Sequence, residues 1–283
     1  MIDLRLGRYQ DTLADVSCDL LCVDAPYSAR THGGHDQAIQ EDTSGRRAIN
    51  YAGWSPEDVR AFVNFFAPKT RGWMVSITDH ILAPEWASAM EGHGRYVFSP
   101  IPWVARGSRV RLQGDGPSSW TCWIIVSRPK TGEDRNGRLY SKWGTLPGAY
   151  VITQERGIVV GNKPLALMSQ IVSDYSRPMD VVCDPCAGGG TTLRAASRLG
   201  RVAIGSEMDP DTWQTASGAL GLIDAEIGSL PLFWELYAEP KDQRIAAGVS
   251  GSQKPSDAHR RQADAAPGSN HGKPGGRMIS ASA

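Results

Sequence analysis

Two short motifs hold residues that can bind ligands. They are Asp24-Ala25-Pro26-Tyr27 and Asp184-Pro185-Cys186-Ala187-Gly188-Gly189-Gly190-Thr191. Each follows a short apolar run, residues 19–23 and 180–183, of the kind that forms a buried parallel strand. Ligands of open α/β sheets bind beyond the carboxyl ends of such strands. The two motifs together therefore predict one site with two halves.

The second motif fits a cofactor that carries a nucleoside. Its glycines let the backbone approach a ligand where a helix begins. Glu207, at the end of the next apolar run, can accept hydrogen bonds from ribose hydroxyls. The third glycine of a dinucleotide site and the Gly-Lys-Ser/Thr of a phosphate loop are both missing. Asp184 suits a cationic amino-acid end, and together with Glu207 it argues against a purely structural turn.

The first motif can hold a planar base by its exocyclic amino group. Such a group offers two N–H donors, which the Asp24 carboxylate and the Ala25 carbonyl can accept. Pro26 stiffens the backbone that presents this carbonyl, and Tyr27 offers a flat face for stacking. Alone, the motif competes with a plain turn. Its place at a strand end beside a nucleoside site favours base binding.

The elements around the motifs predict an α/β fold. Ser55-Pro56-Glu57-Asp58 has the residues that start a helix: an N-cap serine, a proline in the first turn and two acids. Further helical patterns alternate with apolar runs that predict strands at residues 72–77, 96–104, 120–126 and 201–205. This alternation predicts a doubly wound, mostly parallel sheet.

Composition narrows the class of protein. The 283 residues carry 30 basic and 30 acidic side chains, so net charge does not favour a nucleic-acid partner. Residues 105–142 are locally basic, which indicates either a solvated surface or phosphate contacts. Five cysteines, no apolar leader and no membrane-spanning run predict reduced thiols in a cytoplasmic protein. No metal is expected, because the two short Cys and His pairs, 183–186 and 32–35, lack further ligands.

The end of the chain differs from the rest. Residues 240–283 are rich in Gly, Ser, Pro and mixed charge and have few large apolar side chains. Such a composition cannot bury enough surface to fold alone. We therefore expect one folded domain over residues 1–239 and a disordered tail over residues 240–283.

In combination, the motifs resemble those of the amino-methylating DNA methyltransferases, which make N6-methyladenine or N4-methylcytosine. The catalytic motif of that family is Asp/Asn/Ser-Pro-Pro-Tyr/Phe/Trp, and its cofactor motif is Asp-Pro-Phe-x-Gly-Ser-Gly-Thr. Residues 162–168 resemble the family's Gln-Lys-Pro-Leu-x-Leu-Met segment, and residues 205–210 resemble its Gly-x-Glu-x-Asp-Pro element. The catalytic motif comes first, as in the family's beta group. The resemblance covers about residues 4–222.

The resemblance implies the Rossmann-like fold of S-adenosylmethionine-dependent methyltransferases: a doubly wound, mostly parallel, seven-stranded α/β sheet with a short recognition region within residues 105–160. It implies S-adenosylmethionine as cofactor and double-stranded DNA with a flipped base as partner. A homodimer, known in the beta group, has no support of its own in the chain. The implied catalytic residues are Asp24, Ala25, Pro26 and Tyr27. The implied cofactor residues are Asp184, Pro185, Cys186, Gly188, Gly190, Thr191, Glu207, Lys163 and Pro164. For phosphate contacts we expect Arg106, Arg109, Arg111, Arg128 and Lys130.

Three residues depart from the family pattern: Ala25 replaces a proline, Cys186 a phenylalanine, and Asn162 a glutamine. Asp24 favours adenine-N6 as the target, because cytosine-N4 members more often carry serine there; cytosine-N4 is the runner-up. An RNA or protein-amide methyltransferase usually has the cofactor motif first, which the order here opposes. A non-catalytic decoy finds support only in Ala25. The compact size and the lack of a nuclease motif suggest a solitary methyltransferase.

Overall fold

The computed structural model describes residues 1–33, 51–106, 120–155 and 157–227, with the backbone alone for 222–227. The chain divides into two units, Met1–Tyr237 and Ala238–Ala283. Every described residue belongs to the first unit. The predicted disordered tail, residues 240–283, lies outside the described residues.

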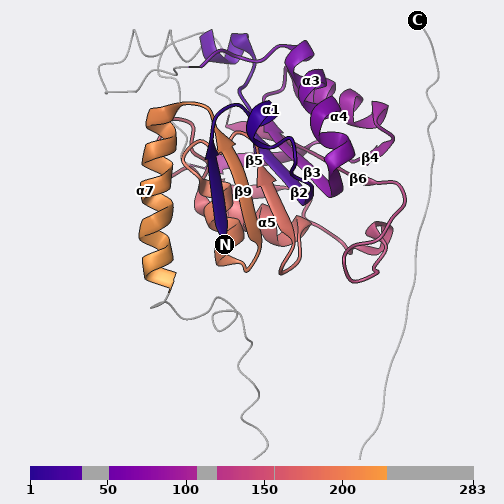
Figure 1. Cartoon of the computed structure of the whole chain (residues 1–283). Coiled ribbons are helices and arrows are strands. Elements are labelled where there is room, and N and C mark those ends of the chain that lie inside the picture. The colour runs from indigo at the N-terminus through magenta and orange to yellow at the C-terminus, as the bar shows by residue number, and fades with distance from the viewer. Residues whose placement is uncertain (34–50, 107–119, 156, 228–283) are drawn as a thin grey trace, which may run out of the picture. The chain divides into compact units, whose positions relative to one another are not determined.

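A mostly parallel sheet forms the centre of the first unit (Figure 1). Across it the strands follow the order β1-β9-β8-β2-β3-β6-β5-β7, and the short β4 also pairs with β6. Only the pairings of β6 with β3, β4 and β5 are antiparallel. The bounds are β1 Ile2–Leu6, β2 Cys18–Asp24, β3 Thr70–Thr78, β4 Arg95–Val97, β5 Ile101–Arg106, β6 Thr121–Pro129, β7 Tyr150–Thr153, β8 Val181–Asp184 and β9 Val202–Glu207.

The mostly parallel α/β sheet confirms the expected fold class, but the expected strand number of seven is wrong. The sheet of the described residues has nine strands. Two of them, β1 and β7, are short and lie at the ends of the strand order, each paired with one neighbour. Strand β1 alternates apolar and polar residues, and β7 contributes an apolar run of only three residues, Tyr150 to Ile152, which is too short to predict a strand. Their pairing with β9 and β5 therefore had no signal in the local sequence.

Helices cover both faces of the sheet. Their bounds are α1 Tyr9–Thr12, α3 Pro56–Phe66, α4 Ala83–Gly92, α5 Leu165–Tyr175, α6 Thr191–Arg198 and α7 Pro210–Ile227, with 3-10 turns η1 Ala67–Lys69 and η2 Tyr140–Lys142. The predicted start of α3 is confirmed: Ser55 and Asp58 form a reciprocal capping box. Among the described helices, none has the length and apolar character to cross a membrane.

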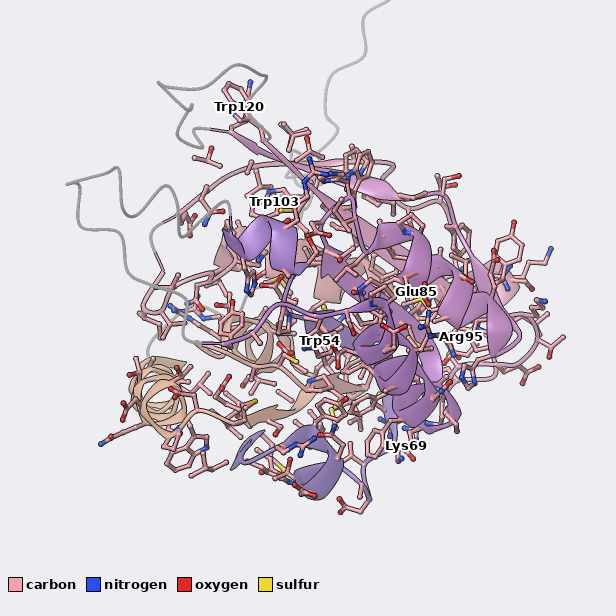
Figure 2. All side chains as sticks on the ribbon, turned by 90° about the horizontal axis from the view of Figure 1, so that it is seen from above. Trp54, Lys69, Glu85, Arg95, Trp103 and Trp120 are labelled. Atoms are coloured by element: carbon pink, nitrogen blue, oxygen red, sulfur yellow. The ribbon has the colours of Figure 1, made fainter. Side chains whose placement is uncertain are left out.

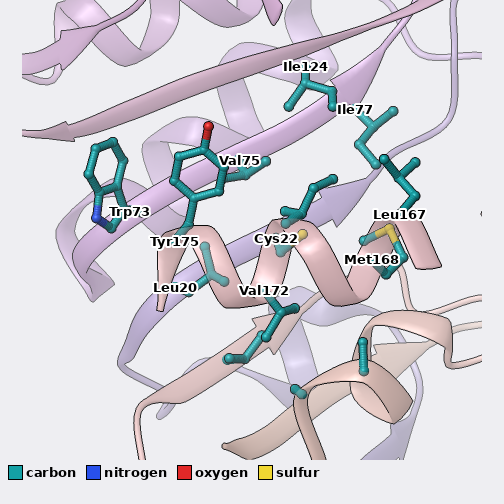
Figure 3. Packing of buried hydrophobic residues seen from close by; sticks show 14 of the residues in the cluster. Leu20, Cys22, Trp73, Val75, Ile77, Ile124, Leu167, Met168, Val172 and Tyr175 are labelled. Atoms are coloured by element: carbon teal, nitrogen blue, oxygen red, sulfur yellow. The ribbon is translucent and has the colours of Figure 1, made fainter. Parts of the chain in front are cut away.

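Strand β2 shows how the two faces are filled. Leu20 and Cys22 point to one face, where they join a buried cluster with residues of α5 and β3 (Figure 3). Leu21 and Val23 point to the other face, where α3 and α4 pack. This alternation follows from the two-residue period of a strand. Because both faces are buried, β2 reads as a continuous apolar run.

The layer made by α3 and α4 is rich in aromatic contacts. The fully buried Phe62 ring lies 4.8 to 5.4 Å from the rings of Tyr9, Trp54, Phe66 and Trp86, measured between centroids. At the surface, Arg60 of α3 donates to Glu85 of α4 at 2.7 Å; Figure 2 labels Glu85 and Trp54 in this layer. This layer packs against Leu21 and Val23 on one face of β2, the strand that ends in the first motif.

The sheet has a topological switch point between β2 and β8, which are hydrogen-bonded neighbours. The chain moves from β2 to β3 on one side, and from β8 to β9 on the other. Connections that leave in opposite directions open a crevice beyond the carboxyl ends of the two strands. Both predicted motifs begin at this crevice.

Replacing Phe62 by Ala should destabilise the fold. The variant removes a fully buried ring from the aromatic layer, which typically costs about 3–5 kcal/mol. Urea unfolding followed by circular dichroism measures the loss. Phe62→Leu, which keeps most of the volume, should cost clearly less. Equal costs for the two variants would contradict the packing described for this layer.

Candidate active site

The site is built on the ends of two adjacent strands. Asp24 ends β2 and Asp184 ends β8, and Leu21 pairs with Cys183 just below them. Asp184 is buried and Asp24 is partly buried. The fold thus brings together the two motifs that lie far apart in the sequence. Both open toward the same crevice.

In the first motif, Asp24 accepts two side-chain hydrogen bonds. Tyr27 Oη donates to Asp24 Oδ1 at 3.3 Å, and Lys163 Nζ forms an ion pair with Asp24 Oδ2. Burial raises the pKa of Asp24, and the ammonium of Lys163 and the Tyr27 hydroxyl partly offset this rise. The Lys163 Nζ atom also lies 5.1 Å from the centroid of the Tyr27 ring. The sequence placed Lys163 in the cofactor half of the site, whereas its ammonium also contacts the base half.

The chain leaving the first motif is held by Asp79, which the sequence analysis did not identify. Its Oδ2 accepts from the Ser28 backbone N–H at 2.9 Å and from the hydroxyls of Ser28 and Thr31 at 2.5 Å each. Its Oδ1 accepts from the N–H groups of Ile81 and Leu82. Burial acts to raise the pKa of Asp79, but these hydrogen bonds outweigh it and the pKa is lowered.

The Asp79 contacts bear on Ala25, which occupies the place of a proline. Ala25 is buried in the apolar cluster on the α3 side. Trp54 N–H donates to the carbonyl of Tyr27 at 2.9 Å, so a second backbone bond holds the motif. A proline would make this backbone rigid locally. Here the hydrogen bonds from Asp79, just after β3, and from Trp54, just before α3, hold it instead. An aspartate directly after a predicted strand is the sequence signal that could have pointed to Asp79.

In the second motif, the glycine turn is tied to two neighbouring segments. Gly188 N–H donates to Glu207 Oε2 at 2.9 Å, and Gly189 N–H donates to Asn162 Oδ1 at 3.2 Å. Gly188 and Gly190 have φ of 51° and 75°, in the left-handed region that favours glycine. A small cavity of about 100 Å³ adjoins this turn; among its lining residues are Asn162, Lys163, Leu165, Gly189, Thr191 and Arg194.

Asp184 lies beneath the same turn. Its Oδ1 accepts from the Cys186 N–H at 3.1 Å. Burial, more than any other cause, raises the pKa of Asp184 to about 7; the hydroxyl of Thr192 and the Cys186 N–H oppose this, and the charges of Asp24 and Glu207 add to it. Pro185 and Cys186 form the turn itself, and burial raises the pKa of the Cys186 thiol. Pro164 is the N-cap residue of α5, directly after Lys163.

Tyr51, which the sequence patterns did not indicate, lies within electrostatic reach of both halves of the site. Burial raises the pKa of its phenol to about 12, and negative charge on Asp24, Cys186 and Glu207 contributes. Its ring meets His32 edge-on, with centroids 5.3 Å apart. An aromatic side chain at the end of a long polar segment was the available signal. Tyr51 is therefore a further candidate for contact with a planar ligand.

The predicted phosphate contacts do not all lie near the motifs. Arg106 ends β5, which runs parallel to β3, so it lies at the same sheet edge as Asp24. Strand β6 is antiparallel, and this places Arg128 and the following Lys130 at the opposite edge. There Arg128 stacks on Tyr96, with 4.7 Å from Cζ to the ring centroid. Arg109 and Arg111 lie outside the described residues.

The two buried acids should affect stability with opposite dependence on pH. The pKa of Asp184 is about 7 in the fold against 3.8 ordinarily, so its contribution is present at low pH and is lost as pH rises from about 4 to 7. The lowered pKa of Asp79 contributes above its ordinary value, and this is lost as pH falls. Relative to the parent protein, Asp184→Asn should gain stability as pH rises from about 4 to 7. Asp79→Asn should instead lose stability as pH rises toward the ordinary aspartate pKa of 3.8, and its deficit should stay level above that.

Urea midpoints of the three proteins at several pH values measure these differences. The Asp79→Asn variant serves as the matched control, since it is also a buried acid-to-amide change at a strand end. Parallel pH profiles for the two variants would contradict the electrostatics described for this site.

Part of the chain is similar to known DNA methyltransferases. Residues 122–217 match the family model described as DNA methylase. Over 72 residues the chain is 36% identical to the Type II methyltransferase M.HindIII of Haemophilus influenzae; this stretch is 25% of the chain and 23% of that relative's length. The chain therefore spans about a quarter of the curated relative that it matches.

Solved structures share the fold. The M1.HpyAVI–SAM complex has a TM-score of 0.55 at 21% identity, covering 77% of this chain and 100% of that one. TTHA0409 of Thermus thermophilus, complexed with S-adenosyl-L-methionine, has a TM-score of 0.54 at 20% identity, covering 81% and 96%. The PvuII DNA methyltransferase, named cytosine-N4-specific, has a TM-score of 0.54 at 14% identity, covering 79% and 91%. With the DNA methylase model matching residues from β6 to α7 and the fold in common, the chain is similar to the N6/N4 amino DNA methyltransferases.

Proposed function

We propose that this protein transfers a methyl group from S-adenosylmethionine to the exocyclic N6 of adenine in DNA. One observation carries the proposal: the carboxylate of Asp24 and the glycine turn after Asp184 lie at adjoining strand ends. The match of residues 122–217 to the DNA methylase model supports the reaction class. The cofactor is supported by relatives with the same fold whose structures are described as complexes with S-adenosylmethionine.

The residues around the glycine turn fit such a cofactor. A side chain on Gly188 would meet no atom within 4 Å, so there is open space above the turn. Lys163 and the N-terminus of α6 suit a carboxylate, because both present positive charge. Asp184 suits the ammonium of the amino-acid end, and Glu207 suits ribose hydroxyls. Glu207 now accepts the N–H of Gly188, and the second lone pairs of its oxygens remain for a ligand.

The base half then holds the acceptor. The Asp24 carboxylate and the Ala25 carbonyl accept the two N–H bonds of the amino group and orient its nitrogen, while Tyr27 stacks on the base. S-adenosylmethionine would supply the methyl group: as the N–CH3 bond forms in line, the S–CH3 bond would break, S-adenosylhomocysteine would leave, and the nitrogen would give up one proton to solvent. Positioning of this kind supplies roughly 7–11 kcal/mol of a barrier. No protein nucleophile is required, and Cys18 and Cys22 stay buried in the core.

The substrate must reach this crevice as an extruded base, which costs a few kcal/mol in a duplex. Arg106 is exposed at the same sheet edge as Asp24, and we assign phosphate contacts to it and to the adjoining Arg109 and Arg111. We do not extend this role to Arg128 and Lys130, since β6 carries them to the opposite edge. DNA would therefore approach the carboxyl ends of the strands.

Adenine is the proposed target because residue 24 is an aspartate, which the N6 members favour. Cytosine-N4 is the second candidate, since the similarly folded PvuII enzyme is named for that base. Mass spectrometry of nucleosides from DNA incubated with the protein and S-adenosylmethionine decides between them. N6-methyladenine is the expected product; N4-methylcytosine alone would overturn the adenine assignment.

Replacing Asp24 by Ala should abolish methylation yet leave cofactor binding within a few-fold of the parent protein. The carboxylate is proposed to accept the target amino group, whereas the glycine turn belongs to β8. Methyl transfer to DNA and calorimetric titration of S-adenosylhomocysteine give the two readouts. Glu91→Ala, an exposed change on α4, is the control and should alter neither. Retained activity in Asp24→Ala would refute the assigned role.

A further inference from the structure

The ammonium of Lys163 occupies the place that the proposed function gives to the target amino group. It is an N–H donor to Asp24 Oδ2, and it lies over the Tyr27 ring at 5.1 Å from the centroid. A base held by Asp24 and stacked on Tyr27 would put its own N–H donor at the same carboxylate. The two donors therefore compete, and the base cannot bind there fully until Lys163 moves.

Lys163 also adjoins the cofactor half of the site. Its side chain lines the cavity at the glycine turn, together with Asn162, Gly189 and Thr191. The side chain is only 10% exposed. Because it contacts Asp24 and also lines this cavity, it lies between the two halves of the site. Besides Asp24, the Nζ atom bonds only the carbonyl of Gly161, at 3.2 Å, among the described residues. A lysine has a flexible four-carbon stem and a point charge, so it can exchange one anionic partner for another.

We propose that Lys163 closes the amino-group site in the cofactor-free protein and is withdrawn by the carboxylate of the methyl donor, so that donor binding opens the site for the base. This inference rests on the proposed function. It assigns to Lys163 a positioning role that couples the two halves of the site.

Charge balance explains why such an exchange is favourable. A carboxylate as enclosed as Asp24 is costly without a partner, and Lys163 satisfies it while the site is empty. A donor molecule brings its own carboxylate to Lys163 and its sulfonium toward Asp24. The ammonium then has a new anionic partner, and Asp24 keeps a neighbouring cation and a free oxygen for the base. Because coupling between two ligands is reciprocal, DNA should strengthen donor binding by the same factor.

Nuclear magnetic resonance of protein labelled with ¹³C at the lysine ε carbons tests the withdrawal. The Lys163 signal is identified by its loss in Lys163→Met. In the free protein it should be displaced by the ring current of Tyr27, and Tyr27→Leu gives its undisplaced position. S-adenosylmethionine should move the signal toward that position. Decarboxylated S-adenosylmethionine, which keeps the sulfonium and the amine, should bind and leave it in place.

The outcomes separate this inference from the proposed function. Calorimetry reports whether each ligand binds. If S-adenosylmethionine binds and the Lys163 signal stays, or if both ligands move it, the inference is overturned while the cofactor assignment stands. If S-adenosylmethionine does not bind at all, the proposed function fails and the inference fails with it.

A second measurement tests the consequence for the base. Fluorescence anisotropy with a labelled single-stranded oligonucleotide of mixed sequence avoids the cost of flipping. S-adenosylmethionine should strengthen binding to the parent protein about fivefold or more, the size of an ordinary coupling. Lys163→Met should bind the oligonucleotide more tightly than the parent without cofactor, and should lose the strengthening. An unchanged coupling in Lys163→Met would overturn the role of this side chain.

Discussion

The pairing of β2 with β8 is the constraint on which the site depends. Only Leu20 with Val182 and Leu21 with Cys183 are in register, yet this short ladder joins two segments from opposite ends of the domain. The strand order reverses at this pair, so the connection after each strand turns away from the other. If the pair slipped by one residue, the buried faces of both strands would be exchanged. The position of Asp24 relative to Asp184 is therefore fixed by the packing of the whole core.

Local patterns in the sequence predicted the parts of the fold that are decided locally. The run before Asp24, the capping box at Ser55 and the glycine turn after Asp184 all have short-range physical causes. Partners from distant segments had no such signal. The Asp79 clamp on Ser28 and the Lys163 ion pair with Asp24 depend on which strands and loops become neighbours. The same limit applies to Arg128, whose edge of the sheet was decided by the direction of β6.

The site gathers acids more densely than cations. Burial is the main cause of the raised pKa of Asp184, and negative charge on Asp24 and Glu207 adds to the rise. A ligand that carries positive charge relieves this repulsion, whereas a pyrophosphate would add to it. The acidic crevice thus favours a cationic cofactor over a dinucleotide for a reason independent of the glycine spacing.

The reversed direction of β6 divides one basic stretch of sequence between two distant edges. At the edge away from Asp24, arginines have structural partners: Arg128 stacks on Tyr96, Arg177 stacks on Trp143, and Arg135 donates to the carbonyl of Met179. Under the proposed function, these cations would lie away from the phosphates of a DNA bound at the carboxyl ends of β2 and β8. The number of counterions released on DNA binding, which sets how steeply affinity falls with salt, therefore cannot be counted from the basic residues of the sequence. Under the proposed function, Arg106 at the end of β5 is the described residue of this stretch that would contribute to that number.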